Sequence, residues 1–346
     1  QQYFLTSAAI QDGLRRWLRD HENDFSLFAE KVCFQLNDTH PAIAVAELMR
    51  LLMDEHGLGW DEAWKITSRC MAYTNHTLLP EALERWSVRA FRELLPRPLD
   101  IIFEINARFL TLVAQRWPGE TDRQARMSII EEGVDPQVRM AHLAIIGSFS
   151  VNGVAELHTR LLKKGMFRDF YELWPERFNN KTNGVTQRRF LRLGNSDLSR
   201  LITDAIGERW ITDLDELRRL RPMAEVPEFR RAWREVRRAN KIRLARMVEA
   251  ECGVACDPES LFDVQVKRIH EYKRQVLNVL HVIHLYDRIK RRDLDDWTPR
   301  CVFFGGKAAP GYWLAKRTIK LINNVAMVVK GDPEVGDLLK VAFLPN

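Results

Sequence analysis

The sequence has no apolar run long enough to cross a membrane. Charged residues break every apolar stretch well before the roughly 18 residues that a membrane span requires. The N-terminus shows no basic region followed by an apolar run, so no targeting signal is visible. These absences favour a soluble, globular chain that has no membrane partner.

Cysteine is scarce as well. The 346 residues include five cysteines, an odd number without a repeating spacing: Cys33, Cys70, Cys252, Cys256 and Cys301. This usage argues against a disulfide scaffold and favours reduced thiols in a cytoplasmic protein. No second Cys or His pair follows Cys252 and Cys256 at the spacing of a zinc site, so we expect no metal.

Several catalytic signatures are missing too. The sequence contains neither a Walker loop nor a G-x-G-x-x-G fingerprint, which argues against a P-loop ATPase and a standard dinucleotide dehydrogenase. It has no G-x-S-x-G elbow, and no side chain stands out as an activated nucleophile. Carboxylates are abundant, but their spacing does not indicate the acid/base pair of an ordinary glycosidase.

What the chain does have is positive charge. Its net charge is +6, and much of it lies between Arg218 and Arg246. In that stretch apolar residues recur at near-helical spacing and arginines fill most other positions, which predicts an amphipathic helix with a solvated basic face. No helix-turn-helix, zinc-finger or RNA-binding signature accompanies it, so we expect no nucleic-acid partner.

The chain alternates between helical periodicity and short apolar runs. With 46% hydrophobic and 29% charged residues it can bury sizeable cores, and its length favours two domains. Helical stretches at 272–292 and 312–329 separate three strand-length runs, which is typical of βαβ units on a parallel sheet. We expect a fourth strand at 32–36, a helix starting near Pro41, another helix at 80–86, and a domain boundary in the polar stretch 179–184. The three runs are 262–266, 301–304 and 341–344.

Ligands of open α/β sheets bind beyond the carboxyl ends of the strands. After the run 262–266 comes Lys-Arg-Ile-His-Glu-Tyr-Lys-Arg at 267–274, a basic cluster at a strand-to-helix junction. This cluster has two possible interpretations: a binding site for an oxyanion, or the solvated basic start of a helix. After 301–304 comes Gly-Gly-Lys-Ala-Ala-Pro-Gly-Tyr at 305–312, whose glycines allow the backbone to approach a ligand closely.

Two histidines lie in similar settings in the first half. Asn-Asp-Thr-His-Pro at 37–41 follows the run 32–36, and Tyr-Thr-Asn-His-Thr at 73–77 precedes the segment 80–86. An N-cap explains Asp38 or Thr39 but not His40. We therefore consider a substrate-binding role for His40 and His76 beside a purely structural one.

Taken together, these segments resemble the α-glucan phosphorylases, the glycogen and maltodextrin phosphorylases. Five segments occur in the family's order over essentially the whole chain: QLNDTHP at 35–41, YTNHTLLPEALERW at 73–86, KTNG at 181–184, QVKRIHEYKR at 265–274 and GKAAPGY at 306–312. Each alone could be chance, but five in order are highly specific.

The resemblance implies an α/β fold of the glycosyltransferase-B type, two Rossmann-like domains flanking a cleft and only partly covered here. Residues 1–181 would be the latter part of the N-terminal glucan-binding domain, and 182–346 the first part of the C-terminal cofactor and phosphate domain. The implied reaction uses inorganic phosphate to release glucose 1-phosphate from α-1,4-glucans with retention of configuration. Pyridoxal 5′-phosphate would be the cofactor and would act through its phosphate group. The resemblance also implies that the full-length enzyme is cytoplasmic, homodimeric and allosteric.

The resemblance also implies roles for single residues. Arg268 and Lys273 would hold substrate phosphate, and Lys267 would contact the cofactor phosphate. His76 and Asn183 would hydrogen-bond the glucosyl unit near its 6-hydroxyl, and Tyr272 its 2-hydroxyl. Two further residues, Asp38 and His40, would form adjoining glucan or loop contacts, and Tyr312 matches half of a stacking site for inhibitors in animal enzymes.

The sequence departs from the family in places. Phe190 stands where the family usually has Trp, which alters an aromatic wall near the cofactor. The family's phosphate loop and its cofactor-binding lysine would lie beyond Asn346, and both ends look cut from a longer sequence. We therefore expect the isolated chain to be inactive and poorly stable. Two alternatives are a nucleotide-sugar glucosyltransferase of the glycogen synthase kind and a noncatalytic glucan-binding fragment.

Overall fold

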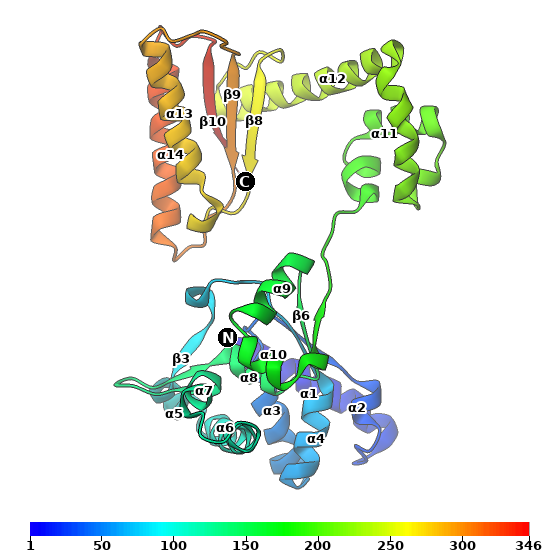
Figure 1. Ribbon diagram of the computed structural model, residues 1–346, viewed down its shortest axis with the longest axis vertical. Coiled ribbons are helices and arrows are strands. Elements are labelled where there is room, and N and C mark those ends of the chain that lie inside the picture. Colours follow the sequence, from blue (N-terminus) through cyan, green and yellow to red (C-terminus); the bar gives the residue numbers. More distant parts are fainter. Residues whose placement is uncertain (346) are drawn as a thin grey trace. The chain divides into compact units, whose positions relative to one another are not determined.

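The computed structural model describes residues 1–345. The chain forms two compact units, Gln1–Gly184 and Val185–Asn346, which are described separately. The division falls at the end of the polar segment 179–184. Each unit contains a parallel sheet covered by helices, so the predicted α/β class is confirmed (Figure 1).

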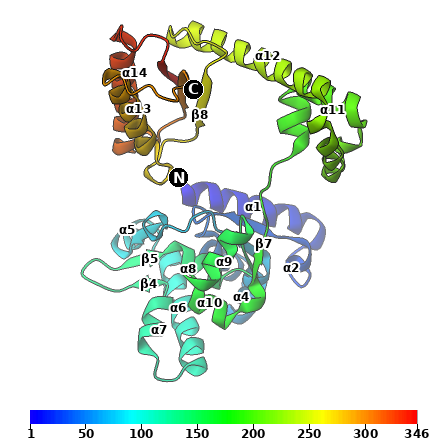
Figure 2. The ribbon, with the colours of Figure 1, turned by 45° about the horizontal axis from the view of Figure 1, so that its top comes forward.

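Unit 1 is built on a four-stranded parallel sheet in the order β1-β2-β6-β7. The strands are β1 (Phe34–Asn37), β2 (Met71–Thr74), β6 (Ser150–Gly153) and β7 (Phe178–Asn180). The helices are α1 (Gln2–His21), α2 (Phe28–Lys31), α3 (Ala44–Arg50), α4 (Trp60–Cys70), α5 (Val88–Leu94), α6 (Pro96–Arg116), α7 (Thr121–Met127), α8 (Met140–Ile146), α9 (Glu156–Lys164) and α10 (Arg168–Leu173). The view in Figure 2 shows α1 along its length beside the rest of this unit.

Helix α3 lies at the centre of the core of unit 1. Every residue from Ala44 to Met49 is buried, and only Arg50 at its end is partly exposed. Such a helix must be covered on all sides. It approaches Gly147 closely, since a Cβ there would lie 2.5 Å from the methyl carbons of Val45. A larger residue at 147 would therefore force core groups apart.

The segment between β2 and β6 carries a small antiparallel sheet, β3 (Arg85–Ser87), β5 (Gln137–Arg139) and β4 (Ile130–Glu131), in the order β3-β5-β4. Here the prediction of a helix at 80–86 is wrong. Pro80 starts a single 3₁₀ turn (Pro80–Ala82), and Arg85–Ser87 then pairs with Gln137–Arg139. A pairing partner some fifty residues away is invisible to local helical periodicity.

Unit 2 contains a three-stranded parallel sheet in the order β10-β9-β8. The strands are β8 (Leu261–Val266), β9 (Arg300–Gly305) and β10 (Leu339–Leu344); the helices are α11 (Ser196–Ile206), α12 (Pro227–Cys252), α13 (Gln275–Lys290) and α14 (Trp313–Gly331). The three predicted strands and both intervening helices are confirmed. No helix within residues 1–345 combines the length and apolarity that a membrane span needs.

The central strand β9 is buried on both faces. Val302 and Phe304 pack with α13 and α14, whereas Cys301 and Phe303 pack with the end of α12. Successive side chains of a strand point to opposite faces, so a continuous apolar run is what a doubly covered strand requires. Figure 1 shows the helix pair and α12 on the two sides of this sheet.

Besides the sheet and its helices, unit 2 has a second part that packs around Trp210. Its indole is fully buried and donates a hydrogen bond to Thr203 Oγ1 at 3.1 Å. Helix α11, the 3₁₀ turn Arg209–Ile211 and the 3₁₀ segment Leu214–Glu225 surround it. Helix α12 begins after this segment and runs on to the sheet, so one helix joins the two parts of the unit.

One carboxylate is completely buried in unit 1. Glu47 on α3 accepts hydrogen bonds from Tyr3 Oη at 3.0 Å and Ser7 Oγ at 2.7 Å, and Arg50 binds it through two nitrogens at 2.9 and 3.0 Å. The bond to Glu47 raises the pKa of Arg50 above its usual value. The network fixes α1 against α3, because a buried charge must keep its partners.

Arg50→Met should therefore weaken the attachment of α1 to α3. Removing one partner of a buried ion pair typically costs about 3 kcal/mol. Hydrogen exchange of the α1 and α3 amides in the full-length protein should show correspondingly faster opening. Arg108→Met removes exposed ion pairs with Glu104 and Asp61 and is the matched control, expected to change opening by less than about 1 kcal/mol. Equal protection in the two variants would contradict the proposed anchoring.

Candidate active site

In unit 1, polar residues follow the carboxyl ends of the parallel strands. Asp38 comes directly after β1, with a positive φ of 65°, and its N–H donates to Thr74 O at 3.0 Å. Asn75 and His76 follow β2. The ring Nε2 of His76 lies 2.6 Å from Asn37 Oδ1, so the ends of β1 and β2 hold this exposed imidazole in place.

A buried amide supports His76. Asn75 is fully buried; its backbone N–H donates to Asn152 O at 2.9 Å, and its side chain donates to Tyr73 Oη at 3.1 Å. Its Oδ1 accepts from the backbone N–H of Thr77 at 3.1 Å. Because every one of these groups is buried or partly buried, the chain on both sides of His76 has little freedom.

His40 is anchored by a carboxylate from the antiparallel segment. Its Nδ1 lies 3.1 Å from Glu84 Oε1, and Glu84 also accepts from Gln2 at 2.7 Å and from Thr39 Oγ1 at 2.8 Å. Burial raises the pKa of Glu84, but hydrogen bonds from Gln2, Thr39 and His40 outweigh it and the pKa is lowered. Glu84 therefore remains ionised and fixes the loop that carries Asp38 and His40.

Asn183 lies near the end of β6. Its backbone N–H donates to Val154 O at 3.0 Å, while its side chain is exposed. Beside it, His158 Nδ1 accepts from the backbone N–H of Val154 at 3.0 Å, and burial lowers the pKa of His158. The ends of β1, β2 and β6 thus bring Asp38, His76 and Asn183 to one edge of the sheet.

In unit 2, the loops that follow β8 and β9 approach each other closely. The N–H of Lys267 donates to Gly305 O and that of Ile269 to Lys307 O, each at 3.0 Å. Gly306 has a φ of 148°, and a Cβ there would overlap the carbonyl oxygen of Lys267. Only glycine fits this position, so the two loops pack backbone to backbone.

A buried glutamine shapes the basic loop. Gln275, at the start of α13, is 1% exposed; its amide donates to Arg268 O at 3.1 Å and accepts from the N–H of His270 at 3.4 Å. Gln265 on β8 donates to Lys273 O at 3.2 Å. The backbone of 268–273 is therefore held from inside, which leaves its cationic side chains free to face outward.

The side chains of this loop carry uncompensated positive charge. Within residues 1–345, no carboxylate forms an ion pair with Lys267, Arg268 or Lys273, although such pairs are numerous elsewhere. Lys267, Lys273 and Arg274 line a common hollow of about 540 Å³ that contains a single acid, Asp263. Arg268 is exposed outside this hollow. Unpaired cations on a backbone that is held in place suit phosphate oxygens.

Aromatic rings lie beside the basic loop. His270 is 4.5 Å from the ring of Tyr272 and 5.0 Å from that of Tyr312. The hydroxyl of Tyr312 donates to Glu271 at 2.5 Å, and this bond raises the pKa of Tyr312. Tyr272 is exposed, and the Lys273 ammonium lies 5.6 Å from its ring. Glu271 is thus engaged by a phenol and does not neutralise the lysines.

The predicted residues therefore form two groups. Unit 1 carries Asp38, His40, His76 and Asn183, and unit 2 carries Lys267, Arg268, Tyr272 and Lys273. Phe190 belongs to unit 2 and lies in the π-helical turn Arg188–Leu193, with 60% of its surface exposed. Within the described residues no three metal-ligating side chains come together.

Sequence reasoning missed three supporting residues. Glu84 belongs to a quoted motif, but its bond to His40 depends on the antiparallel sheet that was predicted to be helical. His158 lies on α9, four residues beyond Val154, from whose backbone N–H it accepts a hydrogen bond, but it belongs to none of the five motifs. Gln275 lies one residue beyond the motif 265–274. Its support of the basic loop becomes visible only in the structure, where it is buried and bonded to the loop backbone.

Comparisons with known proteins identify the family of the chain. The family described as carbohydrate phosphorylase matches residues 1–346. A glycogen phosphorylase of Synechocystis sp. is 56% identical over the whole chain, and the human muscle form and the Chlamydia trachomatis enzyme are each 52% identical. The chain spans 41–42% of the length of these relatives. The predicted resemblance is thus confirmed, and the chain belongs to the carbohydrate phosphorylase family.

Proposed function

We propose that the full-length protein containing this chain is an α-1,4-glucan phosphorylase, which releases glucose 1-phosphate from non-reducing ends with inorganic phosphate. The observation that carries the proposal is the group of unpaired cations after β8, on a backbone that Gly306 and Gln275 hold rigid. Its relatives are named glycogen phosphorylases, which favours this reaction over nucleotide-sugar transfer or glucan binding without turnover.

The reaction needs a dianionic nucleophile held beside other negative charge. Arg268 and Lys273 would bind the substrate phosphate, and the held backbone of their loop limits the reorganisation that binding requires. Arg268 can bind two phosphate oxygens at once, whereas the ammonium of Lys273 acts as a point charge. Since neither has a carboxylate partner in residues 1–345, no existing ion pair has to break on binding.

The residues of unit 1 would recognise the glucosyl unit. His76, held by Asn37 at 2.6 Å, and Asn183 can exchange hydrogen bonds with sugar hydroxyls, and the 6-hydroxyl is the contact we propose. Asp38 and His40 would contact the adjoining glucan or the neighbouring loop. In unit 2 Tyr272 would serve the 2-hydroxyl. Hydrogen-bonded, pre-oriented polar groups give such a site its selectivity.

Pyridoxal 5′-phosphate is the cofactor we propose for the full-length protein. The chain's residues fit its phosphate group, because Lys267 offers an exposed ammonium without an acid partner beside a close approach of two backbone strands. When bound, this cofactor would supply a phosphate group that exchanges a proton with the substrate phosphate. Lys267 would hold that phosphate and offset its charge, and Phe190 would contribute an apolar surface without an indole donor.

We also propose that the full-length protein is a cytoplasmic homodimer. All five cysteines are free, which suits a reducing compartment. Light scattering of the purified full-length protein would test the dimer.

The proposed activity is tested by incubating the full-length protein with maltodextrin and inorganic phosphate, or with a nucleotide-activated glucose. Phosphate-dependent release of glucose 1-phosphate is expected. Glucosyl transfer from the nucleotide sugar, or glucan binding without either reaction, would refute the proposal.

Arg268→Ala should reduce phosphorolysis far more than glucan binding, because it removes a bidentate cation from a phosphate held near other negative charge. The expected loss in kcat/KM for phosphate is on the order of 3 kcal/mol, and Lys273→Ala should behave similarly. Arg291→Ala, which removes an exposed cation at the C-cap of α13 that is paired with Asp287 at 2.8 Å, is the control and should be near wild type. Normal turnover of Arg268→Ala at limiting phosphate would show that the cations do not bind substrate.

His76→Ala and Asn183→Ala should impair recognition of the glucosyl unit. A site built to bond a hydroxyl leaves its own polar groups unpaired when that hydroxyl is missing. The loss in kcat/KM should therefore shrink when a substrate with a 6-deoxy terminal unit replaces the normal glucan. If each variant lost the same factor on both substrates, the contact with the 6-hydroxyl would be ruled out.

A further inference from the structure

A second concentration of positive charge lies in unit 2, away from the basic loop after β8. It lines a hollow of about 600 Å³ between α12, the 3₁₀ segment Leu214–Glu225 and the loop around Glu259. Its lining residues are Leu220, Ala224, Phe229, Arg230, Trp233, Arg234, Arg237, Arg238, Lys241, Pro258 and Glu259. Five of them are cationic and only Glu259 is acidic.

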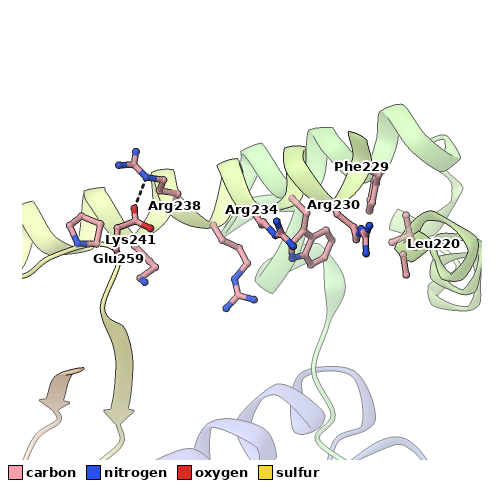
Figure 3. A pocket seen from close by; sticks show the side chains of 11 residues that line it. Leu220, Phe229, Arg230, Arg234, Arg238, Lys241 and Glu259 are labelled. Atoms are coloured by element: carbon pink, nitrogen blue, oxygen red, sulfur yellow. Dashed lines mark hydrogen bonds and ion pairs between the residues drawn. The ribbon is translucent and has the colours of Figure 1, made fainter. Parts of the chain in front are cut away.

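The cations at the two ends of this hollow differ in their bonding partners (Figure 3). At the loop end, Arg238 binds Glu259 at 2.6 Å, and Lys241 donates to Ser260 O at 2.6 Å. These two cations hold the loop against α12 and so have a structural function. At the other end, Arg230 lies beside Phe229 and Leu220, and Arg234 projects from the middle of the helix.

Arg230, Arg234 and Arg237 have no ion-pair partner among residues 1–345, unlike Arg238 and Arg243 on the same helix. They occupy positions i, i+4 and i+7 and therefore share one helix face, over roughly 10 Å of its length. The four helical neighbours of Arg234 at i±3 and i±4 are all arginines: Arg230, Arg231, Arg237 and Arg238.

Like charges at these spacings destabilise a helix. A helix face whose charges alternate in sign avoids this cost. The four acids of α12, Glu228, Glu235, Glu249 and Glu251, all lie outside the hollow. The unpaired arginines are therefore better explained by an anion that binds among them.

Aromatic surface completes the hollow. Trp233 and Phe229 are both partly buried, with ring centres 6.1 Å apart, and both contribute to the lining. A phosphate alone needs no such surface, whereas a flat organic ring gains stacking energy from it. The volume lies within the range of small-molecule sites.

We propose that this hollow, formed by Arg230, Arg234, Arg237 and Trp233, binds a small molecule that contains both two or more linked phosphate groups and a planar ring. The guanidinium groups bind the phosphates and Trp233 contacts the ring. The site is separate from the basic loop at 267–274, with which it shares no lining residue. It does not depend on the reaction proposed above.

Calorimetric titration of the full-length protein with ADP tests the proposal, with tripolyphosphate and adenosine as the two half-probes. Arg234→Ala should weaken ADP binding by at least about tenfold, since a charge-assisted contact is lost. Trp233→Ala should weaken ADP binding by about fivefold or more but leave tripolyphosphate unchanged. Arg246→Ala, an exposed α12 variant outside the hollow, should bind as the wild type does.

Arg268→Ala separates this site from the basic loop, and ADP binding should persist in that variant. Circular dichroism should show that every variant remains folded. Absence of ADP binding at millimolar concentration, or unaltered binding by Arg234→Ala, would overturn the proposal. Loss of binding in Arg268→Ala alone would assign the ligand to the other cluster, and equal effects of Trp233→Ala on both probes would exclude a ring contact.

Discussion

The parallel pairing of strands is the constraint on which both units depend. In a parallel sheet all carboxyl ends reach the same edge, and the connections must return by helices on the faces. In unit 1 this places the residues after β1, β2 and β6 together, although they are more than a hundred residues apart in the sequence. In unit 2 it brings Lys267, after β8, within hydrogen-bond distance of Gly305, at the end of β9.

In unit 2, close contact between two backbone segments fixes the loops at this edge of the sheet. At Gly306 a side chain has no room because the carbonyl oxygen of Lys267 occupies its place. The two loops therefore hold each other, and Gln275 fixes the same loop from the core side. If a flexible loop carried these cations, ordering the loop on ligand binding would reduce the net binding free energy. A loop that is already held in place before binding loses little. The rigidity comes from neutral groups, and the charges remain available.

Much of this arrangement could be predicted from the sequence because its signals are local. An apolar run such as 301–304, flanked by helical periodicity, indicates a strand covered on both faces, and the structure confirms it. The basic motif at 267–274 was also visible. What could not be predicted depends on distant partners: β3 is a strand only because residues 137–139 pair with it, and Glu84 holds His40 only because that pairing brings it there. Local propensity cannot supply such contacts.

The same physics distinguishes the cations that hold the structure from those that remain available for ligands. Arg50 has two bonds to a buried carboxylate, and Arg238 is occupied by Glu259, so neither can bind an anion without giving up a partner. Lys267, Arg268 and Arg234 have no such partner within residues 1–345. Positive charge without a partner repels its neighbours and contributes little to folding. Where a rigid backbone nevertheless keeps several such cations together, ligand binding accounts for them better than stability does, and this reasoning applies equally to the loop after β8 and to the hollow on α12.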